Sequence, residues 1–354
     1  MPLRPRLRVM AAAAALVSAL LPSAALAGVT SLSHLFVFGD SLSDSGNAGV
    51  ISGGTFTPAP YAGNRATNGP VAVEQLWQQF NPGDTSFKPS LLGGSNFAIL
   101  GATSGKENNL ETSSNLPPIL QAAYANKGNA WQLQNFISAN PSFEAQTSLF
   151  VVWLFPNDVF YFRGTGYGNS AGTYDGSDGT ATSFNAIDDL AVSNVLGTIN
   201  TLASRGARHF LVVNSPDLGL TPAFRGTAAA ADMTAISSDF NSKLETDLST
   251  FTSANPLLDI ELFQLDDVLN QLISSPTTYG LTNVTDPCLT SISVCSNPSQ
   301  YLFWDTLHPT TAGHALIAQR LYSTVVETPS PLPLLGFSAA MGWSRRLRQR
   351  LKVG

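Results

Sequence analysis

The sequence predicts an α/β protein with a three-layer, doubly wound fold and a mostly parallel, five-stranded sheet. Short apolar runs alternate along the chain with longer amphipathic ones, and buried parallel strands have the form of continuous apolar runs. Strands that alternate with helices form a doubly wound sheet covered on both faces. The chain has 354 residues, of which 44% are hydrophobic, so it is long enough for a sizeable core.

The expected elements follow one another in this alternation. Strands are predicted at residues 34–38, 96–100, 149–154, 209–214 and 258–263. Helices are predicted at residues 71–80, 131–139, 186–203, 228–251 and 311–326. The glycine-rich, polar stretch at 164–182 is expected to be a surface excursion. Ligand-binding groups of such a sheet lie beyond the carboxyl ends of the strands, so residues that directly follow a strand are the first candidates for chemistry.

The first 27 residues have the three parts of a secretory signal peptide. Arg4, Arg6 and Arg8 precede an apolar run over residues 9–21, and Ala25-Leu26-Ala27 provides the small residues of a cleavage site. A buried N-terminal helix is the alternative, but it does not account for the flanking arginines. We therefore expect an exported protein cut after Ala27, with a main domain over residues 28–326 and a tail over residues 327–354.

Charge argues against a nucleic-acid partner. Eight of the 18 basic residues and one of the 24 acidic residues, Glu327, lie in the two terminal segments, which leaves ten against 23 and a body charge near −13. An acidic body repels phosphate backbones. The two cysteines, Cys288 and Cys295, lie in one polar loop, and in an exported protein such a pair is expected to form a local disulfide. No third or fourth ligand at zinc spacing accompanies them.

A serine follows the first predicted strand in a turn. The chain there is Phe38-Gly39-Asp40-Ser41-Leu42-Ser43-Asp44-Ser45-Gly46-Asn47. A strand-to-loop transition of this kind would expose the Ser41 hydroxyl above the sheet edge, with the following amides free to face an anion. An ordinary cap is the alternative, because Ser and Asp both favour caps.

A serine hydroxyl becomes a good nucleophile only beside a base that a third group orients. His308 follows Asp305 by three residues, just before the last predicted helix, so the carboxylate can reach the ring and fix its tautomer. His34 and His209 are expected to be structural because they begin strands, and His314, inside the last helix, is expected to be either exposed or packed.

Together these segments resemble the first and last blocks of the GDSL, or SGNH, hydrolase family. Two further blocks of the same family are similar: Gly94-Ser95-Asn96-Phe97-Ala98-Ile99-Leu100-Gly101-Ala102-Thr103-Ser104 and Trp153-Leu154-Phe155-Pro156-Asn157-Asp158. Lesser similarity lies in Asn68-Gly69-Pro70 and in Asn214-Ser215-Pro216-Asp217-Leu218-Gly219. The resemblance covers roughly residues 33–325, and it implies a flavodoxin-like fold for the main domain, which would be catalytic.

The resemblance also implies roles for individual residues. Ser41 would be the nucleophile of a carboxylic-ester hydrolase, His308 its base and Asp305 the acid that holds the ring. The oxyanion would be bound by the amides of Ser41 and Gly101 and by the side chain of Asn157. The family usually has glycine where this chain has Phe155, so a changed pocket wall is expected there, or simply a core aromatic. No cofactor and no metal are implied, because dinucleotide, phosphate-loop and calcium-loop patterns are absent.

A second serine fits a different hydrolase pattern. Gly168-Asn169-Ser170-Ala171-Gly172 matches Gly-x-Ser-x-Gly, the nucleophile elbow of α/β-hydrolases. That motif requires a strand before it and a helix after it, whereas this one lies in a glycine-rich loop. Ser170 is therefore not expected to be the nucleophile.

The C-terminal tail resembles the PEP-CTERM sorting signals of exported bacterial proteins. Prolines at 329, 331 and 333 precede a short apolar stretch, and an arginine-rich end follows it. The apolar part is too short to span a bilayer comfortably, and Glu327-Thr328-Pro329 replaces the usual Val-Pro-Glu-Pro. The expectation is transient membrane contact and recognition by a sorting protease. The alternative is a simple amphipathic tail.

Several functions fit these observations. The first is an exported esterase acting on acyl lipids or small acyl esters, at the cell surface, in the periplasm or outside the cell. Polysaccharide O-deacetylation and phospholipase or acyltransferase activity are the alternatives within the family. The non-enzymatic alternative is a surface or matrix protein that has the same fold but does not turn over a substrate.

Overall fold

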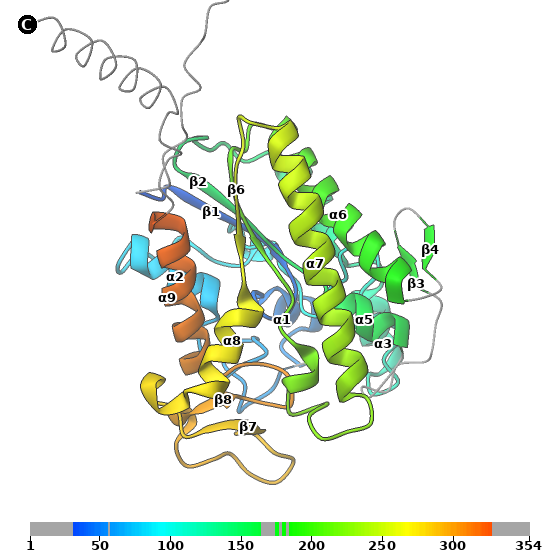
Figure 1. Cartoon of the computed structure of the whole chain (residues 1–354), viewed down its shortest axis with the longest axis vertical. Helices are drawn as coiled ribbons and strands as arrows, with labels where there is room; N and C mark the ends of the chain where they lie inside the picture. Colours follow the sequence, from blue (N-terminus) through cyan, green and yellow to red (C-terminus); the bar gives the residue numbers. More distant parts are fainter. Residues whose placement is uncertain (1–30, 56, 164–173, 177–178, 182–183, 328–354) are drawn as a thin grey trace, which may run out of the picture. The chain divides into compact units, whose positions relative to one another are not determined.

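The computed structural model describes residues 31–327, apart from residues 56, 164–173, 177–178 and 182–183 (Figure 1). The strands are β1 (His34–Gly39), β2 (Ser148–Trp153), β3 (Tyr174–Gly176), β4 (Gly179–Ala181), β5 (His209–Val213), β6 (Asp259–Phe263), β7 (Asn283–Pro287) and β8 (Tyr301–Phe303). The α-helices are α1 (Asn47–Ser52), α2 (Ala72–Phe80), α3 (Pro118–Tyr124), α4 (Asn129–Ala139), α5 (Pro156–Arg163), α6 (Phe184–Ser204), α7 (Ala230–Ala254), α8 (Leu265–Ser274) and α9 (Thr311–Glu327). Short 3-10 helices lie at Ser90–Leu92, Asn109–Thr112, Leu218–Leu220, Pro276–Tyr279 and Pro298–Gln300.

The central sheet is parallel and has the order β1-β2-β5-β6. Four of the five predicted strands are therefore present, with bounds that differ by one residue at most from those expected. β1, β2 and β5 are largely apolar because helices cover both faces of the sheet, which is the reason continuous apolar runs predict parallel strands, whereas the edge strand β6 has two acidic residues.

The fifth predicted strand, residues 96–100, is not a regular strand. It lies beside β1 and bonds to it through the amides of Phe97 and Ile99, which donate to the Val37 and Gly39 carbonyls at 2.8 and 3.0 Å. Its outer carbonyls, those of Asn96 and Ala98, accept from the Asn47 side chain at 2.8 and 2.9 Å. The Asn47 side chain and the backbone of residues 88–90 satisfy the outer edge, and the segment forms two isolated β-bridges, Val37–Asn96 and Pro89–Asn96, before it turns at Leu100.

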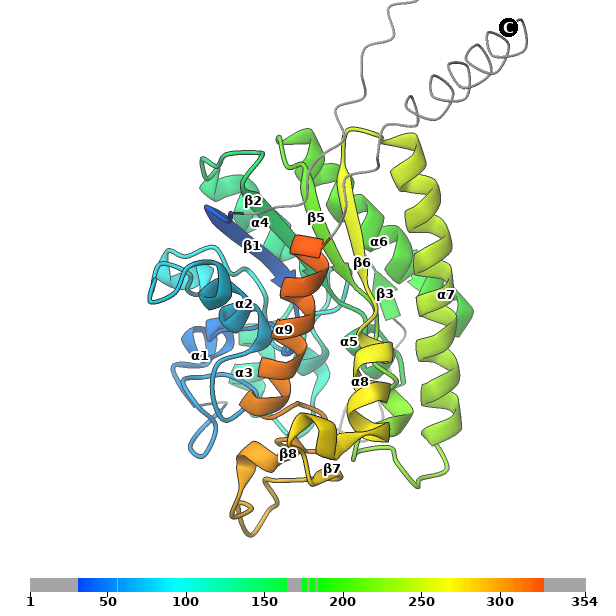
Figure 2. The ribbon, with the colours of Figure 1, turned by 60° about the vertical axis from the view of Figure 1, so that its left-hand side comes forward.

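Alternate residues of each strand pack into two separate cores. Phe36 and Phe38 of β1 join the core beneath α4, α6 and α7, whereas Leu35 and Val37 join the core beneath α2, α8 and α9. Figures 1 and 2 show these two helix layers on opposite sides of the sheet. The predicted three-layer architecture is confirmed.

The five predicted helices are present as α2, α4, α6, α7 and α9. Four shorter helices, α1, α3, α5 and α8, were not predicted, because apolar periodicity is weak over one or two turns. The small strand pairs β3-β4 and β7-β8 were also missed. Within the described part of the chain, no helix combines the length and the apolar character needed to cross a membrane. The predicted signal peptide, almost all of the predicted tail and Ser170 lie outside the described residues.

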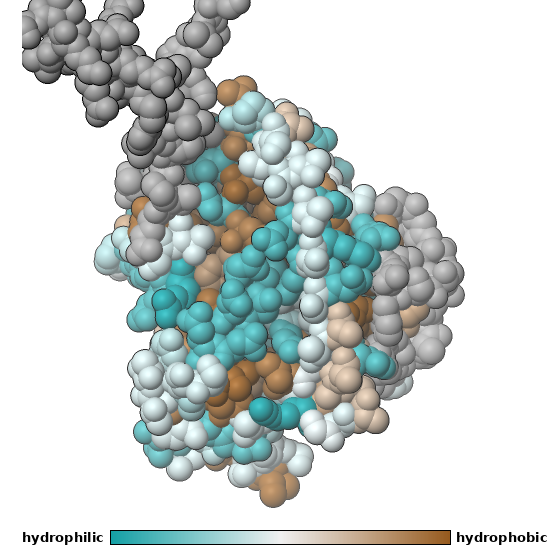
Figure 3. All heavy atoms as spheres, viewed as in Figure 1, coloured by the Kyte–Doolittle hydropathy of each residue, from teal (hydrophilic) through white to brown (hydrophobic). Residues whose placement is uncertain are grey.

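One edge of the sheet ends at β6, which pairs only with β5 among the described strands. Four of its five residues are half-buried. Figure 3 shows hydrophobic residues on the surface along the line of β6, between α7 and α9. Two acidic residues, Asp259 and Glu261, alternate with Ile260 and Leu262 on this strand.

Candidate active site

Ser41 lies in a tight turn at the carboxyl end of β1. The amides of Ser43 and Asp44 donate to the Asp40 carbonyl at 3.2 and 2.9 Å, and the Leu42 amide donates to the Asp40 carboxylate at 2.9 Å. Gly39 precedes the turn, where an added Cβ would lie 2.9 Å from the Trp153 carbonyl oxygen. The backbone path thus requires glycine, and it leaves Ser41 at the sheet edge with 9% of its surface exposed.

The structure brings Ser41, His308 and Asp305 together. His308 Nε2 lies 2.9 Å from Ser41 Oγ, and His308 Nδ1 lies 2.8 Å from Asp305 Oδ2. The Asp305 carboxylate also accepts hydrogen bonds from the amides of Leu307 and His308, both at 2.8 Å. A carboxylate at Nδ1 requires a proton on that nitrogen, which leaves Nε2 free to accept the proton of Ser41.

The electrostatic surroundings of Asp305 and His308 favour an ion pair between them. Burial opposes the charged form of His308, but the charges of Asp305 and Asp40 and the bond to Asp305 outweigh it and raise the His308 pKa above its usual value. Burial likewise acts to raise the pKa of Asp305, but His308 and the two backbone amides lower it below its usual range. Asp305 is therefore ionised when His308 becomes protonated.

Gly101 follows the segment that runs beside β1, and its backbone conformation favours glycine, with φ +83°. An added Cβ would lie 2.8 Å from Leu110 Cγ, so both the torsion and the space require glycine. Gly101 and Ser41 line the same cavity. Among the hydrogen bonds of the described residues, none uses the amide of either one as donor.

Asn157 is the second residue of the helix α5 and lines the same cavity. Its side-chain nitrogen donates to Asp40 Oδ2 at 3.2 Å. An amide nitrogen has two hydrogens, so this bond orients the group and leaves a second donor. Burial raises the pKa of Asp40 to about 7, although the Leu42 amide and His308 act in the opposite direction.

Two buried carboxylates that sequence reasoning missed hold these segments in register. Asp158 accepts from the amide and the hydroxyl of Ser104 at 2.9 and 2.6 Å, which joins α5 to the Gly101 loop. Asp44 accepts from four amides, those of Gly46, Asn47, Ala48 and Leu100, which joins the Ser41 turn to the same loop. Both residues lie in the family-like blocks of the sequence, but no local pattern predicts their hydrogen-bond partners.

Phe155, the least typical residue of its block, is a core aromatic and does not line the cavity. The expectation of a changed pocket wall at this position is therefore wrong. Its φ is +128°, a region that favours glycine. The ring is fully buried and stacks on Phe240 of α7 with ring centroids 3.8 Å apart. The aromatic contact holds a backbone conformation in which other residues than glycine are strained.

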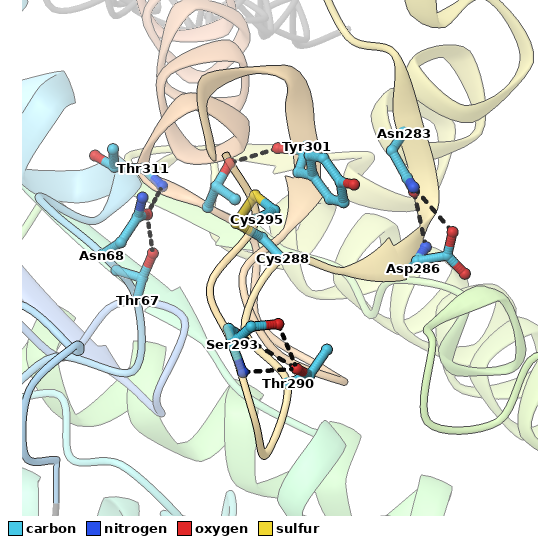
Figure 4. The surroundings of a disulfide bond; sticks show 11 residues. Thr67, Asn68, Asn283, Asp286, Cys288, Thr290, Ser293, Cys295, Tyr301 and Thr311 are labelled. Carbon is cyan, nitrogen blue, oxygen red and sulfur yellow. Dashed lines mark hydrogen bonds between the residues drawn. A yellow bond between two sulfur atoms is a disulfide. The ribbon is translucent and has the colours of Figure 1, made fainter. Parts of the chain in front are cut away.

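The segment that carries His308 is held at its far end by the Asn68 block. Asn68 Oδ1 accepts from the first amide of α9, that of Thr311, at 2.8 Å (Figure 4). The Thr67 hydroxyl donates to the Pro309 carbonyl at 2.7 Å. A Cβ on Gly69 would lie 2.7 Å from the Thr311 hydroxyl. These contacts explain why an Asn-Gly pair far away in sequence belongs to the site.

The predicted disulfide is present and supports the near end of the same segment. Cys288 and Cys295 are bonded, and the hairpin that they close is crossed by bonds between Thr290 and Ser293 (Figure 4). The Cys288 and Leu289 amides donate to the carbonyls of Phe303 and Trp304 at 3.0 and 2.6 Å. Trp304 directly precedes Asp305, so the hairpin packs against the backbone that carries the acid.

A cavity of about 330 Å³ opens at Ser41 and His308. Its wall includes apolar side chains from several elements, among them Leu100, Leu110, Leu116, Phe160 and Leu218. Its size falls within the range of small-molecule sites, and its lining of apolar groups around a few polar ones is typical of them. No group of three His, Cys, Asp or Glu side chains suited to a metal ion occurs among the described residues.

The remaining histidines lie away from this cavity. His209 is buried at the start of β5 with Nδ1 2.8 Å from Asp259, and His34 begins β1. His314 is buried in α9, where Nδ1 accepts from the Ala72 amide at 3.2 Å and burial lowers its pKa to about 3. His34 and His209 thus lie at the strand starts where structural roles were predicted, and His314 takes the packed one of its two expected placements.

Comparison with known proteins identifies similar chains. The family described as GDSL-like Lipase/Acylhydrolase matches residues 35–321. An uncharacterised protein of Pseudomonas putida is 29% identical over 346 residues, which are 90% of this chain and 52% of that protein. A GDSL esterase/lipase of Arabidopsis thaliana is 28% identical over 145 residues, 40% of this chain and 42% of that one. This chain thus spans about half the length of the curated relatives that it matches. Among solved structures, an acetylxylan esterase of Geobacillus stearothermophilus is 12% identical with a TM-score of 0.42, over 84% of this chain and 96% of that one.

Proposed function

The chain belongs to the GDSL-like lipase/acylhydrolase family, and on this basis we propose that it is a serine esterase that hydrolyses carboxylic esters through an acyl-enzyme on Ser41. The single observation that carries the proposal is the Ser41–His308–Asp305 chain of contacts, with 2.9 and 2.8 Å between successive partners. A serine, a base and an orienting acid at hydrogen-bond distance are the parts that acyl transfer requires.

In the first step, His308 Nε2 takes the proton of Ser41 as Oγ attacks the ester carbonyl carbon. The carbonyl oxygen becomes an oxyanion, which the amides of Ser41 and Gly101 and the Asn157 side chain stabilise. The tetrahedral intermediate then collapses, and the leaving alkoxide takes the proton from His308. Asp305 stays ionised throughout and stabilises the imidazolium.

In the second step, water gives a proton to His308 and attacks the acyl carbon. The second intermediate releases the carboxylic acid, and the proton returns to Ser41 Oγ. The enzyme is thereby restored with one water consumed.

The preferred substrate in this proposal is an ester with an apolar acyl group. The cavity beside Ser41 has leucine and phenylalanine side chains on several walls, and an acetyl group would leave most of that surface without contact. Esters with longer apolar acyl groups, such as acyl lipids, therefore rank above acetylated polysaccharides.

Export is a further part of the proposal. It is supported by the signal-peptide pattern at residues 1–27 and by the Cys288–Cys295 disulfide, which persists in oxidising compartments. Processing of the tail at residues 327–354 by a sorting protease belongs to the same proposal. Intact-mass measurement of the protein recovered from its natural host tests both cleavages.

A panel of p-nitrophenyl esters from acetyl to palmitoyl tests the activity. We expect hydrolysis by the wild type, with kcat/KM higher for longer acyl chains than for acetate, and loss of turnover in Ser41→Ala. An active-site fluorophosphonate is expected to label Ser41. Labelling of the Ser41→Ala protein at Ser170 would reject Ser41 as the nucleophile. If the acetate ester is hydrolysed fastest, a deacetylase is favoured. A folded wild type that hydrolyses no ester would favour a non-catalytic surface protein.

A further inference from the structure

Asp305 has a partner outside its own segment. The hydroxyl of Tyr61 donates to Asp305 Oδ2 at 2.9 Å. Oδ2 is also the oxygen closest to His308 Nδ1, at 2.8 Å. The phenol therefore bonds the same carboxylate oxygen that orients the histidine, and it comes from a loop 244 residues earlier in the chain.

Tyr61 is held in place on both sides of this bond. Its ring packs edge-on against Trp304, with centroids 6.2 Å apart at 82°. Its amide donates to the Pro58 carbonyl at 3.1 Å, and the Ala62 amide donates to the Thr67 carbonyl at 2.9 Å. These contacts limit the rotation of the phenol, so that its hydroxyl stays at Oδ2.

The loop that carries Tyr61 forms hydrogen bonds with the His308 segment at two points. Tyr61 bonds Asp305 before His308, and Thr67 bonds the Pro309 carbonyl after it. The same loop contributes Thr57, Tyr61 and Ala66 to the wall of the cavity. One loop thus contacts both the space where substrate would lie and the acid that orients the base.

We propose that Tyr61 is a positioning residue that holds the Asp305 carboxylate at His308 Nδ1 and shares its negative charge. The proposal rests on the esterase function proposed above. The Tyr61 proton remains on its own oxygen throughout. The hydrogen bond from Tyr61 to Oδ2 stabilises part of the negative charge of the Asp305 carboxylate. It also keeps the carboxylate from rotating away from the imidazole ring while His308 takes and returns the Ser41 proton.

The charged surroundings of His308 come from three elements. Asp305 lies on its own segment, and Asp40 lies on the turn after β1. His314 of α9 is neutral near neutral pH, because burial lowers its pKa to about 3. Loss of the Tyr61 hydroxyl leaves these groups in place and concentrates the charge of Asp305 on the ring, so the protonated form of His308 becomes more favourable.

Tyr61→Phe tests the proposal because it removes the hydroxyl and keeps the ring against Trp304. We expect kcat to fall roughly tenfold, as for loss of a hydrogen bond to a charged group, with KM little changed. The acid limb of the kcat/KM profile is expected to move to higher pH, and the proton NMR signal of the His308 Nδ1–H to shift. If the Tyr61 hydroxyl has only a structural role, its loss would lower the melting temperature. The acid limb of kcat/KM and the His308 Nδ1–H signal would then stay unchanged.

Tyr161→Phe is the matched control. The Tyr161 hydroxyl also donates to a carboxylate, that of Glu111, at 3.0 Å, but this pair does not include Asp305 or His308. We expect its pH limb and kcat to equal those of the wild type. The proposal is overturned if Tyr61→Phe keeps the wild-type kcat, limb and proton signal, or if both variants lose activity equally. Ester hydrolysis that survives Ser41→Ala would instead overturn the esterase proposal, whatever Tyr61→Phe does.

Discussion

At the scale of single residues, the bond between Asp40 and Asn157 connects the turn of the proposed nucleophile, Ser41, to a proposed oxyanion donor. The Asn157 nitrogen gives one hydrogen to Asp40 Oδ2 at 3.2 Å, which fixes the direction of the other. A donor that is already oriented needs no reorganisation free energy when charge develops on the substrate. Such preorganised donors stabilise transition states strongly.

Asn157→Ala is therefore expected to lower kcat by about 10²- to 10³-fold, because it removes a donor that acts on the oxyanion and not on the ground-state ester. KM should change far less. Steady-state kinetics on a p-nitrophenyl ester measure both constants. An unchanged kcat would remove Asn157 from the reaction.

The pH dependence of activity follows from His308. The ring must be neutral to accept the Ser41 proton, and Asp305 and Asp40 raise its pKa above the usual 6.5. Protonation at low pH therefore removes activity, and the acid limb of kcat/KM is expected above pH 6.5. The rate of hydrolysis between pH 5 and 9 measures this limb, and a midpoint at or below 6.5 would contradict the arrangement.

Phe155 offsets backbone strain with aromatic packing. A buried Phe→Ala change costs about 3–5 kcal/mol, and a strained non-glycine torsion about 1–3 kcal/mol. Phe155→Gly should therefore lower the free energy of unfolding by roughly 2 kcal/mol, since more packing is lost than strain is relieved. Urea unfolding measures the change. A more stable variant would show that strain at φ +128° outweighs the stack on Phe240.

At the scale of elements, the start of α9 places His308. The helix begins at Thr311, three residues after His308, and its first amide bonds Asn68 from a distant loop. Helix N-termini leave amides without partners inside the helix, and a side-chain acceptor there stabilises the end. The position of His308 thus depends on a contact between two segments 243 residues apart.

Asn68→Ala should lower stability by about 1 kcal/mol and also lower kcat, because the end of the His308 segment loses its anchor. Asn283→Ala is the control, since its side chain accepts from the Thr285 and Asp286 amides on β7 in a bond of the same kind (Figure 4). We expect a similar loss of stability there with kcat unchanged. Thermal unfolding and ester kinetics on both variants decide the point, and equal kcat in the two would refute the anchoring role of Asn68.

At the scale of the whole molecule, the site depends on convergence of the carboxyl ends of parallel strands. Ser41 follows β1 and Asn157 follows β2, while Gly101 ends the segment beside β1. Asp305 and His308 come from the loop between β8 and α9. Only the assembled open sheet with its two helix layers makes these five residues neighbours.

The edge of the same sheet has its own pH dependence. Burial and the neighbouring charge of Asp259 raise the pKa of Glu261 from 4.5 to about 7. The folded state therefore binds more protons than the unfolded state between these values, and this contribution to stability is present below about pH 4.5 and lost as pH rises through 7.

Glu261→Gln cannot ionise, so it should unfold at a higher temperature than the wild type at pH 8 and at a similar temperature at pH 4. Glu245→Gln is the control, because Glu245 is exposed on α7 and should change neither melting temperature. Melting curves at the two pH values give the comparison. A Glu261→Gln protein that is less stable than the wild type at pH 8 would contradict the burial of this carboxyl.

Local patterns in the sequence predict much of this molecule. Four strands and five helices follow from apolar periodicity, because both faces of the sheet are buried and each long helix has one apolar side. Asp305 and His308 lie three residues apart, so their contact is local. The turn at Ser41 is also local, since Gly39 and Asp40 determine its backbone path.

What only the tertiary structure decides are the contacts between distant segments. The bond of Tyr61 to Asp305, the orientation of Asn157 by Asp40 and the anchoring of α9 by Asn68 each join residues more than 100 positions apart. Residues 96–100 have the composition of a strand but follow β1 irregularly, because the Asn47 side chain and the backbone of residues 88–90, not a further strand, satisfy their outer edge. Phe155 has no local signal for its torsion, since the stack on Phe240 that holds it comes from another helix. The periodicity of the sequence indicates which residues are buried. Which buried residues contact one another depends on how the layers of the fold pack.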